Sequence, residues 1–212
     1  WGTLCATEEK ASGELAYWCW GANWNSALVP GNGNNAVDTP TQLDLVASQD
    51  VLAMGYGINC ALGKIANGAE NLYCWGGPAD VGYTQQALDP LPSQLALGAA
   101  QVFALRAGEV FAWGENAAEQ LSLGNSTTPI LPPTKLPNFT GVKAIDASGN
   151  ATAALLDNGE IWWWSIYDVR HEEALSSLGV KLSASPADFG GCTLLESGCI
   201  HCWSDFAGEI CP

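Results

Sequence analysis

Cysteine is the residue type with the clearest chemical potential in this sequence. The chain has eight cysteines among 212 residues, and an even number is typical of a disulfide framework built in an oxidising compartment. The stretch "CIHC", from Cys199 to Cys202, raises the alternative of a metal site. Pairs that bind metal usually lie on tight turns, whereas residues three apart on an extended strand face opposite sides. Because this stretch has the pattern of a strand, we favour disulfides over a metal site.

Side chains suited to catalysis are few. The chain has only two histidines, and one of them, His201, occupies an aromatic position of a repeated unit, which favours packing in the core. Adjacent carboxylates such as Glu8-Glu9 seldom converge on one substrate atom. The Gly-x-Gly stretches lack the strand-to-helix context of a phosphate-binding loop. We therefore expect no enzyme, no catalytic residue and no cofactor.

The charge balance argues against nucleic acid as a partner. The chain carries 22 acidic and 7 basic residues, for a net charge of -15, whereas phosphate binding needs clustered lysine and arginine. No run of about 18 apolar residues occurs, so we expect no membrane insertion.

Three sequons add to the evidence from the cysteines. They begin at Asn125, Asn138 and Asn150, and such acceptor sites belong to surfaces of secreted proteins. Asn125 and Asn138 lie in loop-like sequence, while Asn150 enters a predicted strand and is the weaker acceptor. Together with the cysteines, the sequons predict a protein located outside the cytosol.

A repeated unit contains these residues. The stretches 5–21 and 60–76 both begin with Cys-Ala and end with Cys-Trp-Gly. Five tryptophans share this local pattern, and two residues before each stands an aromatic residue or histidine. These tryptophans, which recur every 38 to 55 residues, are Trp20, Trp75, Trp113, Trp164 and Trp203.

The repeated units predict small antiparallel sheets. Apolar runs of five to seven residues are bounded by glycine, asparagine and aspartate, and the stretch 151–165 predicts a hairpin around Asn158-Gly159, because Asn-Gly readily adopts positive φ angles. Strands that are apolar on both faces must be covered on both, as they are when small sheets stack. Repeats of this length therefore predict an all-β fold, a β-propeller.

Two units resemble the regulator of chromosome condensation repeat. The matching residues are "GINCAL" with "LYCWG", and "GEVFAWGEN" with "QLSLGN". The resemblance implies a single propeller domain over residues 1–212, with about five blades in a small or incompletely closed ring. Members of this family usually close seven blades. Nucleotide exchange on a nuclear GTPase is not expected to carry over, because the chain is acidic and its cysteines indicate another compartment.

The repeat also predicts how the cysteines pair. Two cysteines that flank a hairpin can join neighbouring strands of one blade, so repeat equivalence predicts Cys5–Cys19 and Cys60–Cys74. The last unit then pairs Cys192 with Cys202, and the remaining pair is Cys199 and Cys211. Disulfide-bearing copies of this repeat resemble the outer domains of crinkly-type plant receptor kinases. We therefore expect a secreted, disulfide-bonded glycoprotein without metal ligands.

Two binding functions remain open. The chain is either a protein-interaction module, whose partner is another protein or a copy of itself, or a lectin-like propeller that binds a glycan. The loop aromatics Trp24 and Tyr83 suit either kind of contact, although packing against their own blades is the alternative. The loops vary in length and content between units, which favours protein recognition.

Strand edges favour assembly. The first unit begins at its Cys-Ala strand and has no counterpart of the predicted strand 142–148, and the last unit has only "GEICP" to form an outer strand. Because an unpaired strand edge is a template for pairing with another chain, we hypothesise that the chain is a structural subunit of a larger extracellular assembly.

Overall fold

Small antiparallel sheets make up the part of the chain that the computed structural model describes. The described residues are 3–23, 27–30, 33, 35–76, 81–126, 130–137, 139–165, 169–171, 179–184, 191–203 and 208–212. The chain divides into two compact units, residues 1–91 and 92–212, which are treated one at a time below. The single domain over residues 1–212 stays a prediction. Among the described residues, no helix has the length and apolar character needed to cross a membrane.

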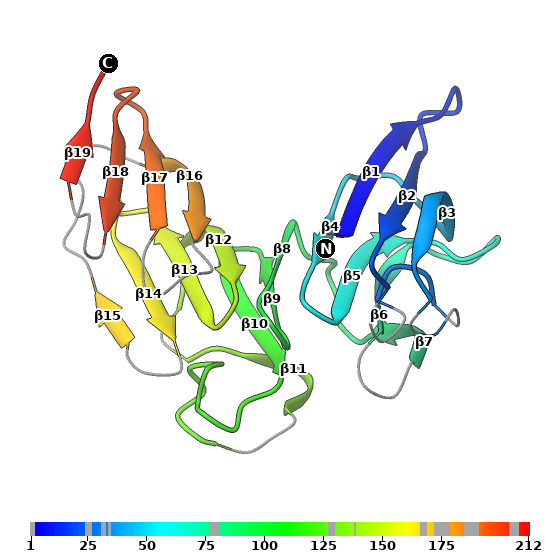
Figure 1. Ribbon diagram of the computed structural model, residues 1–212. Coiled ribbons are helices and arrows are strands. Elements are labelled where there is room, and N and C mark those ends of the chain that lie inside the picture. Colours follow the sequence, from blue (N-terminus) through cyan, green and yellow to red (C-terminus); the bar gives the residue numbers. More distant parts are fainter. Residues whose placement is uncertain are drawn as a thin grey trace. The chain divides into compact units, whose positions relative to one another are not determined.

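The unit 1–91 contains two sheets (Figure 1). The first has the order β1-β2-β3 and consists of β1 (Thr3–Glu9), β2 (Leu15–Gly21) and β3 (Val37–Ala47). The second has the order β4-β5-β6-β7 and consists of β4 (Leu52–Met54), β5 (Ile58–Gly63), β6 (Asn71–Gly76) and β7 (Val81–Gln86).

The unit 92–212 contains three sheets of four strands each (Figure 1). The third sheet consists of β8 (Gln94–Leu97), β9 (Gln101–Arg106), β10 (Glu109–Gly114) and β11 (Ile130–Lys135). The fourth consists of β12 (Val142–Ser148), β13 (Ala151–Leu156), β14 (Ile161–Ser165) and β15 (Val169–His171). The fifth consists of β16 (Gly179–Ala184), β17 (Gly191–Leu195), β18 (Ile200–Trp203) and β19 (Gly208–Ile210).

The all-β prediction of five repeat units is confirmed, because each sheet carries one of the five repeated tryptophans. In the four-stranded sheets this tryptophan lies on the third strand and is buried, as Trp75 and Trp164 illustrate. Among the described residues the first sheet has three strands, β1 to β3, and its repeated residue, Trp20 on β2, is only half-buried.

Stacked sheets form the cores, as the strands that are apolar on both faces predict. In the unit 1–91, Tyr17 and Leu45 of the first sheet pack in one cluster with Trp75 of the second. In the unit 92–212, Phe103 of the third sheet shares a cluster with Trp164 of the fourth. Burial of apolar side chains between sheets is the main source of stability in such repeats.

A buried asparagine shapes the loop that follows the repeated tryptophan. Asn23, which is 1 % exposed, accepts a hydrogen bond from the main-chain N–H of Leu28 and donates one to the carbonyl of Gly33. Asn116, which is fully buried, accepts a hydrogen bond from the N–H of Leu121 in the same way. Because a buried polar group must be satisfied, each asparagine holds its loop in one conformation.

The same loops link neighbouring sheets within a unit. The indole N–H of Trp75 donates to the carbonyl of Ala27 at 2.9 Å, and that of Trp164 donates to the carbonyl of Gln120 at 3.2 Å. Ala27 and Gln120 hold equivalent positions in their repeats, seven residues after Trp20 and Trp113. Trp75 and Trp164 therefore each fill a core, and each holds the loop of the preceding sheet through its indole hydrogen bond.

The backbone explains the glycine that follows the repeated tryptophan. Gly76 has a φ of 90°, and a Cβ at this position would lie 2.6 Å from the carbonyl oxygen of Gly57. A positive φ and so close an approach exclude ordinary side chains. In the hairpin predicted at Asn158-Gly159, only the glycine has a positive φ, of 87°. Gly159 thus supplies the positive φ of that turn, and the Asn158 side chain accepts a hydrogen bond from the N–H of Glu160 at 3.0 Å.

Candidate functional site

Strand β1 is an unpaired sheet edge in the part of the chain that the structure describes. It pairs with β2 on one side only, at the end of the order β1-β2-β3 (Figure 1). Six of its seven residues are exposed, and Leu4 retains 58 % of its accessible surface. An exposed row of backbone donors and acceptors can pair with another polypeptide.

The direction of these backbone groups follows from the register. Cys5 lies opposite Cys19, with 4.1 Å between the two Cα atoms. A separation this short is typical of a pair that does not exchange backbone hydrogen bonds. The N–H and C=O of Cys5 therefore point away from β2. By alternation, those of Thr3 and Thr7 do the same.

Acidic groups surround one end of this edge. Glu8 and Glu9 are exposed on β1, and the Thr7 hydroxyl donates to Asp50 at 3.0 Å. Glu8 also accepts a hydrogen bond from the indole N–H of Trp18 at 2.8 Å. A cationic side chain on a partner would find complementary charge at this end.

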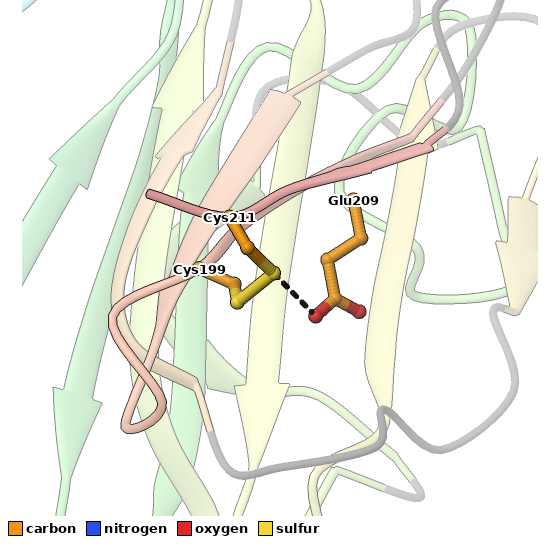
Figure 2. A group of neighbouring side chains, drawn as sticks. All are labelled: Cys199, Glu209 and Cys211. Carbon is orange, nitrogen blue, oxygen red and sulfur yellow. Dashed lines mark hydrogen bonds between the residues drawn. A yellow bond between two sulfur atoms is a disulfide. The ribbon is translucent and has the colours of Figure 1, made fainter.

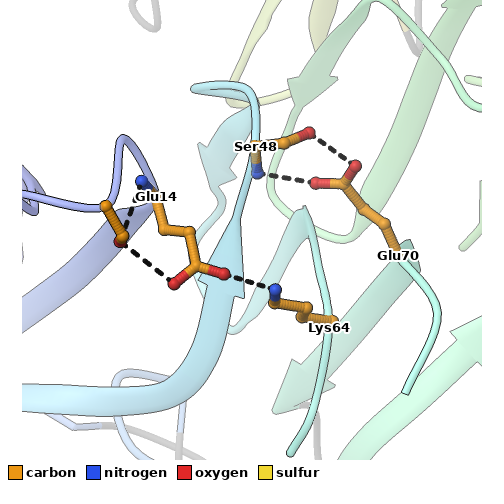
Figure 3. A network of polar contacts seen from close by, with 5 residues as sticks. Glu14, Ser48, Lys64 and Glu70 are labelled. Atoms are coloured by element: carbon orange, nitrogen blue, oxygen red, sulfur yellow. Dashed lines mark hydrogen bonds and ion pairs between the residues drawn. The ribbon is translucent and has the colours of Figure 1, made fainter. Parts of the chain in front are cut away.

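Polar contacts join the first sheet to the second at two places, the turn of the β1–β2 hairpin and the end of β3 (Figure 3). Lys64 forms an ion pair with Glu14, and the carboxylate of Glu70 accepts hydrogen bonds from the N–H and hydroxyl of Ser48 at 2.8 and 2.6 Å. The hydrogen bond from Lys64 lowers the pKa of Glu14. Of these contacts, the Lys64–Glu14 pair reaches the hairpin that carries the exposed edge.

Tyr17, a buried residue on β2 of the same hairpin, predicts that the stability of the fold depends on pH in the alkaline range. The Tyr17 hydroxyl donates to the carbonyl of Gln49 at 3.2 Å. Burial, with a smaller contribution from the charge of Asp50, raises the pKa of Tyr17 to about 12 from 10.0. Between these values the folded chain keeps a proton that the unfolded chain has lost. This contribution to stability is therefore complete below pH 10 and is lost as the pH rises through 12.

The expected result is a fall in unfolding free energy of about 2–3 kcal/mol from pH 10 to pH 12 that depends on Tyr17. Denaturant titrations at several pH values on the parent chain and on Tyr17→Phe would measure it. The variant removes the titrating group and should show a shallower decline. Parallel declines in the two proteins would contradict the assignment.

The predicted cysteine pairs are those joined in the structure: Cys5–Cys19, Cys60–Cys74, Cys192–Cys202 and Cys199–Cys211. Within "CIHC", Cys202 of β18 bonds to Cys192 of β17, whereas Cys199, just before β18, bonds to Cys211, just after β19. In the first two pairs and in Cys192–Cys202 the partners lie directly opposite each other in the sheet register.

A possible metal-ligand group lies at the end of β19. Ligand atoms of Cys199, Glu209 and Cys211 come within 4.8 Å of one another (Figure 2). However, both sulfurs belong to one disulfide, and the ligand that cysteine offers to a metal is the thiolate. Glu209 Oε1 lies 3.4 Å from Cys211 Sγ, which carries no proton in the disulfide. The group therefore binds no metal through sulfur while it is oxidised.

The structure describes only some of the remaining residues predicted for binding or glycosylation. Trp24 and Asn138 lie outside the described residues, as does the side chain of Tyr83, whose backbone belongs to β7. Asn125 is exposed in a loop. Asn150 is exposed in the turn between β12 and β13, rather than inside the strand that the sequence predicts.

Sequence reasoning missed Leu4 and Asp50 as parts of an exposed edge. Leu4 precedes the first Cys-Ala, at the position that Asn59 holds before the second. An apolar residue there, in a unit without its first strand, was the signal that could have pointed to it. Asp50 lies 43 residues from Thr7 along the chain, and no local pattern indicates that contact.

Comparison with known proteins supports the repeat assignment. Residues 107–155 match the Regulator of chromosome condensation (RCC1) repeat. The chain is 29 % identical over 161 residues to the Ultraviolet-B receptor UVR8 of Arabidopsis thaliana, which covers 68 % of this chain and 36 % of that protein.

Two solved structures have a similar fold. Yeast RCC1 (Prp20), solved bound to Kap60, superposes with a TM-score of 0.68 at 19 % identity, over 95 % of this chain and 54 % of that one. The ectodomain of the Physcomitrella patens receptor kinase CR4 gives 0.52 at 20 % identity, over 93 % of this chain and 51 % of that one. This chain thus spans about half the length of these structures, and less of UVR8.

Proposed function

We propose that this chain, a member of the RCC1-like repeat β-propeller family, is a non-enzymatic protein-interaction module that works outside the cell. The exposed backbone edge of β1 carries the proposal, because such an edge offers main-chain hydrogen bonds to another polypeptide. Its partner is another protein or a copy of the chain itself, in a larger extracellular assembly.

The similar proteins support an interaction role at the level of the fold. Yeast RCC1, whose fold is similar, was solved bound to another protein, Kap60. Because fold similarity does not transfer a function, the interaction assigned to this chain rests on its own β1 edge.

Four disulfides support the extracellular part of the proposal. All eight cysteines are paired, and stable disulfides of this density are typical of oxidising compartments. The CR4 similarity is to a receptor ectodomain. The exposed positions of Asn125 and Asn150 suit glycosylation, and the acidic surface would keep the protein soluble.

Native mass spectrometry on protein from its natural source tests the proposal. We expect the mass of the denatured chain to rise by the eight hydrogens of four disulfides upon reduction, and to fall upon enzymatic removal of glycans. We also expect native species heavier than one chain. Free thiols without glycan would contradict the extracellular assignment. A monomer under every native condition would contradict the assembly.

A further inference from the structure

We propose that the Cys199–Cys211 disulfide is reversible, and that its reduction turns Cys199, Glu209 and Cys211 into a binding site for Zn²⁺. In the oxidised chain the disulfide fastens the end of β19 to the start of β18. In the reduced chain two thiolates and a carboxylate fasten the same two strands through the metal. This site lies outside the proposed interaction surface and does not depend on it.

Three of the four disulfides belong to the repeat, and this one does not. Cys19, Cys74 and Cys202 each stand directly before a repeated tryptophan and bond to the cysteine opposite on the neighbouring strand. Cys199 stands three residues before Cys202. At the same place the other four units have no cysteine: Ala16, Asn71, Glu109 and Glu160. The other four sheets thus form without such a bond.

The group has the donor chemistry of a zinc site (Figure 2). The ligand atoms of Cys199, Glu209 and Cys211 all lie within 4.8 Å of one another. Zinc binds thiolate sulfur at about 2.3 Å and carboxylate oxygen at about 2.0–2.2 Å, so one ion can reach all three after small movements of the side chains. Two thiolates favour Zn²⁺ over Ca²⁺ and Mg²⁺, which take oxygen ligands.

The β18–β19 hairpin places a further donor on the same face. His201 of β18 pairs with Glu209 of β19, and residues directly opposite in an antiparallel pair share a face. His201 also stands two residues after Cys199, so alternation along the strand puts both on one side. The two strands thus carry Cys-x-His and Glu-x-Cys. A structural zinc ion takes four ligands, and the register places His201 to complete the set.

The position of β19 lets a reductant reach this bond. Cys211 is exposed, whereas Cys60 and Cys74 are 0 % and 3 % exposed on two central strands. Strand β19 is the outermost of its sheet, as β7, β11 and β15 are of sheets beyond which the chain continues. The edge position of β19 is therefore a property of the blade. A disulfide with an accessible sulfur is the easier one to exchange.

The redox step needs a dithiol as the reductant. One thiolate of the dithiol attacks Cys211 Sγ, the S–S bond breaks, and Cys199 leaves as a thiolate. The second thiol of the reductant attacks the mixed disulfide and releases Cys211. The dithiol ends as its own disulfide, and two electrons and two protons pass to the two cysteines. Binding of Zn²⁺ then displaces these two protons.

Metal binding to the folded chain before and after partial reduction tests the site. One equivalent of a phosphine reductant, removed before metal is added, should open this disulfide first, as differential alkylation and peptide mass mapping would show. Co²⁺ should then give a thiolate-to-cobalt charge-transfer band that Zn²⁺ abolishes, and the oxidised chain should give none. Reduction of another pair first would overturn the proposal, and so would the absence of the band after reduction of this pair.

Two variants with the same chemical change form a matched pair. Glu209→Gln removes the carboxylate ligand and should weaken Zn²⁺ binding by the reduced chain about tenfold or more, the loss that even an outer-shell change causes. Glu196→Gln, at an exposed residue between β17 and β18 and outside the group, should leave the affinity unchanged. Equal affinities of the two variants would contradict the role of Glu209 as a ligand.

Hydrogen exchange reports whether the metal holds the strand. The amides of β19 (Gly208–Ile210) should be protected in the oxidised chain, exchange faster after reduction, and regain protection when Zn²⁺ is added. Fast exchange that persists with zinc bound would show that the thiolates bind the metal without joining β19 to β18. That result would overturn the proposal and leave the proposed interaction function standing.

Discussion

Replacing Trp164 with alanine should lower the free energy of unfolding by roughly 3–5 kcal/mol. Trp164 is fully buried and packs against the rings of Phe103 and Phe139, with centroids 5.7 and 5.1 Å away. Alanine would leave a cavity between the third and fourth sheets. It would also leave the carbonyl of Gln120 without the indole hydrogen bond. Denaturant titration followed by circular dichroism would measure the loss.

Two further variants separate the causes. Trp164→Phe keeps most of the apolar burial and removes the N–H donor, so it should cost about 1–3 kcal/mol. Trp18→Ala is the same truncation at a half-buried tryptophan, whose N–H donates to the exposed carboxylate of Glu8. It should cost clearly less than Trp164→Ala. If both alanine variants unfolded at the same denaturant concentration as the parent, the core role of Trp164 would be wrong.

The repeated tryptophan made much of the fold predictable. A large side chain recurring with the same neighbours indicates one structural unit repeated, and the apolar runs around it indicate strands covered on both faces. Because a hairpin places residues directly opposite one another, repeat equivalence was enough to pair Cys5 with Cys19 and Cys60 with Cys74. The structure contains both pairs.

The repeated asparagine in the loop after the tryptophan is visible in the sequence, but sequence reasoning did not recognise its structural role. Asn23 and Asn116 both stand three residues after a repeated tryptophan, and both prove to be buried loop centres. Asparagine in a polar, glycine-rich loop usually indicates an exposed turn. Only the position of the loop against a neighbouring sheet, which no local pattern encodes, distinguishes a buried asparagine from a solvated one.

Two other features depend on tertiary structure alone. The division of the chain after Leu91 has no marker in the repeat, whose units continue on both sides. The exposure of Leu4 follows from the absence of a neighbouring strand. Only the register against β2 shows which residues of β1 lie along this edge.

Removing the Cys60–Cys74 disulfide should lower the free energy of unfolding by about 3 kcal/mol. The two cysteines are 14 residues apart, and closing a loop of this length restricts the unfolded chain by roughly that amount. Both residues are buried and lie opposite each other on β5 and β6, the two central strands of the second sheet. The Cys60→Ala/Cys74→Ala variant would be compared with the parent by denaturant titration under non-reducing conditions.

The Cys199–Cys211 pair is the matched control, because its separation of 12 residues is similar. There Cys211 is exposed, and it is preceded by β19, whose three residues are all exposed. Without the bond, β19 can detach in the folded protein, so the folded and the unfolded states both gain freedom and the net loss is smaller. Equal losses for the two double variants would show that β19 is held as firmly as β6. In the third sheet Phe103 and Ala112 stand opposite each other at the position of the Cys60–Cys74 pair, so packing alone performs there what the bond does in the second sheet.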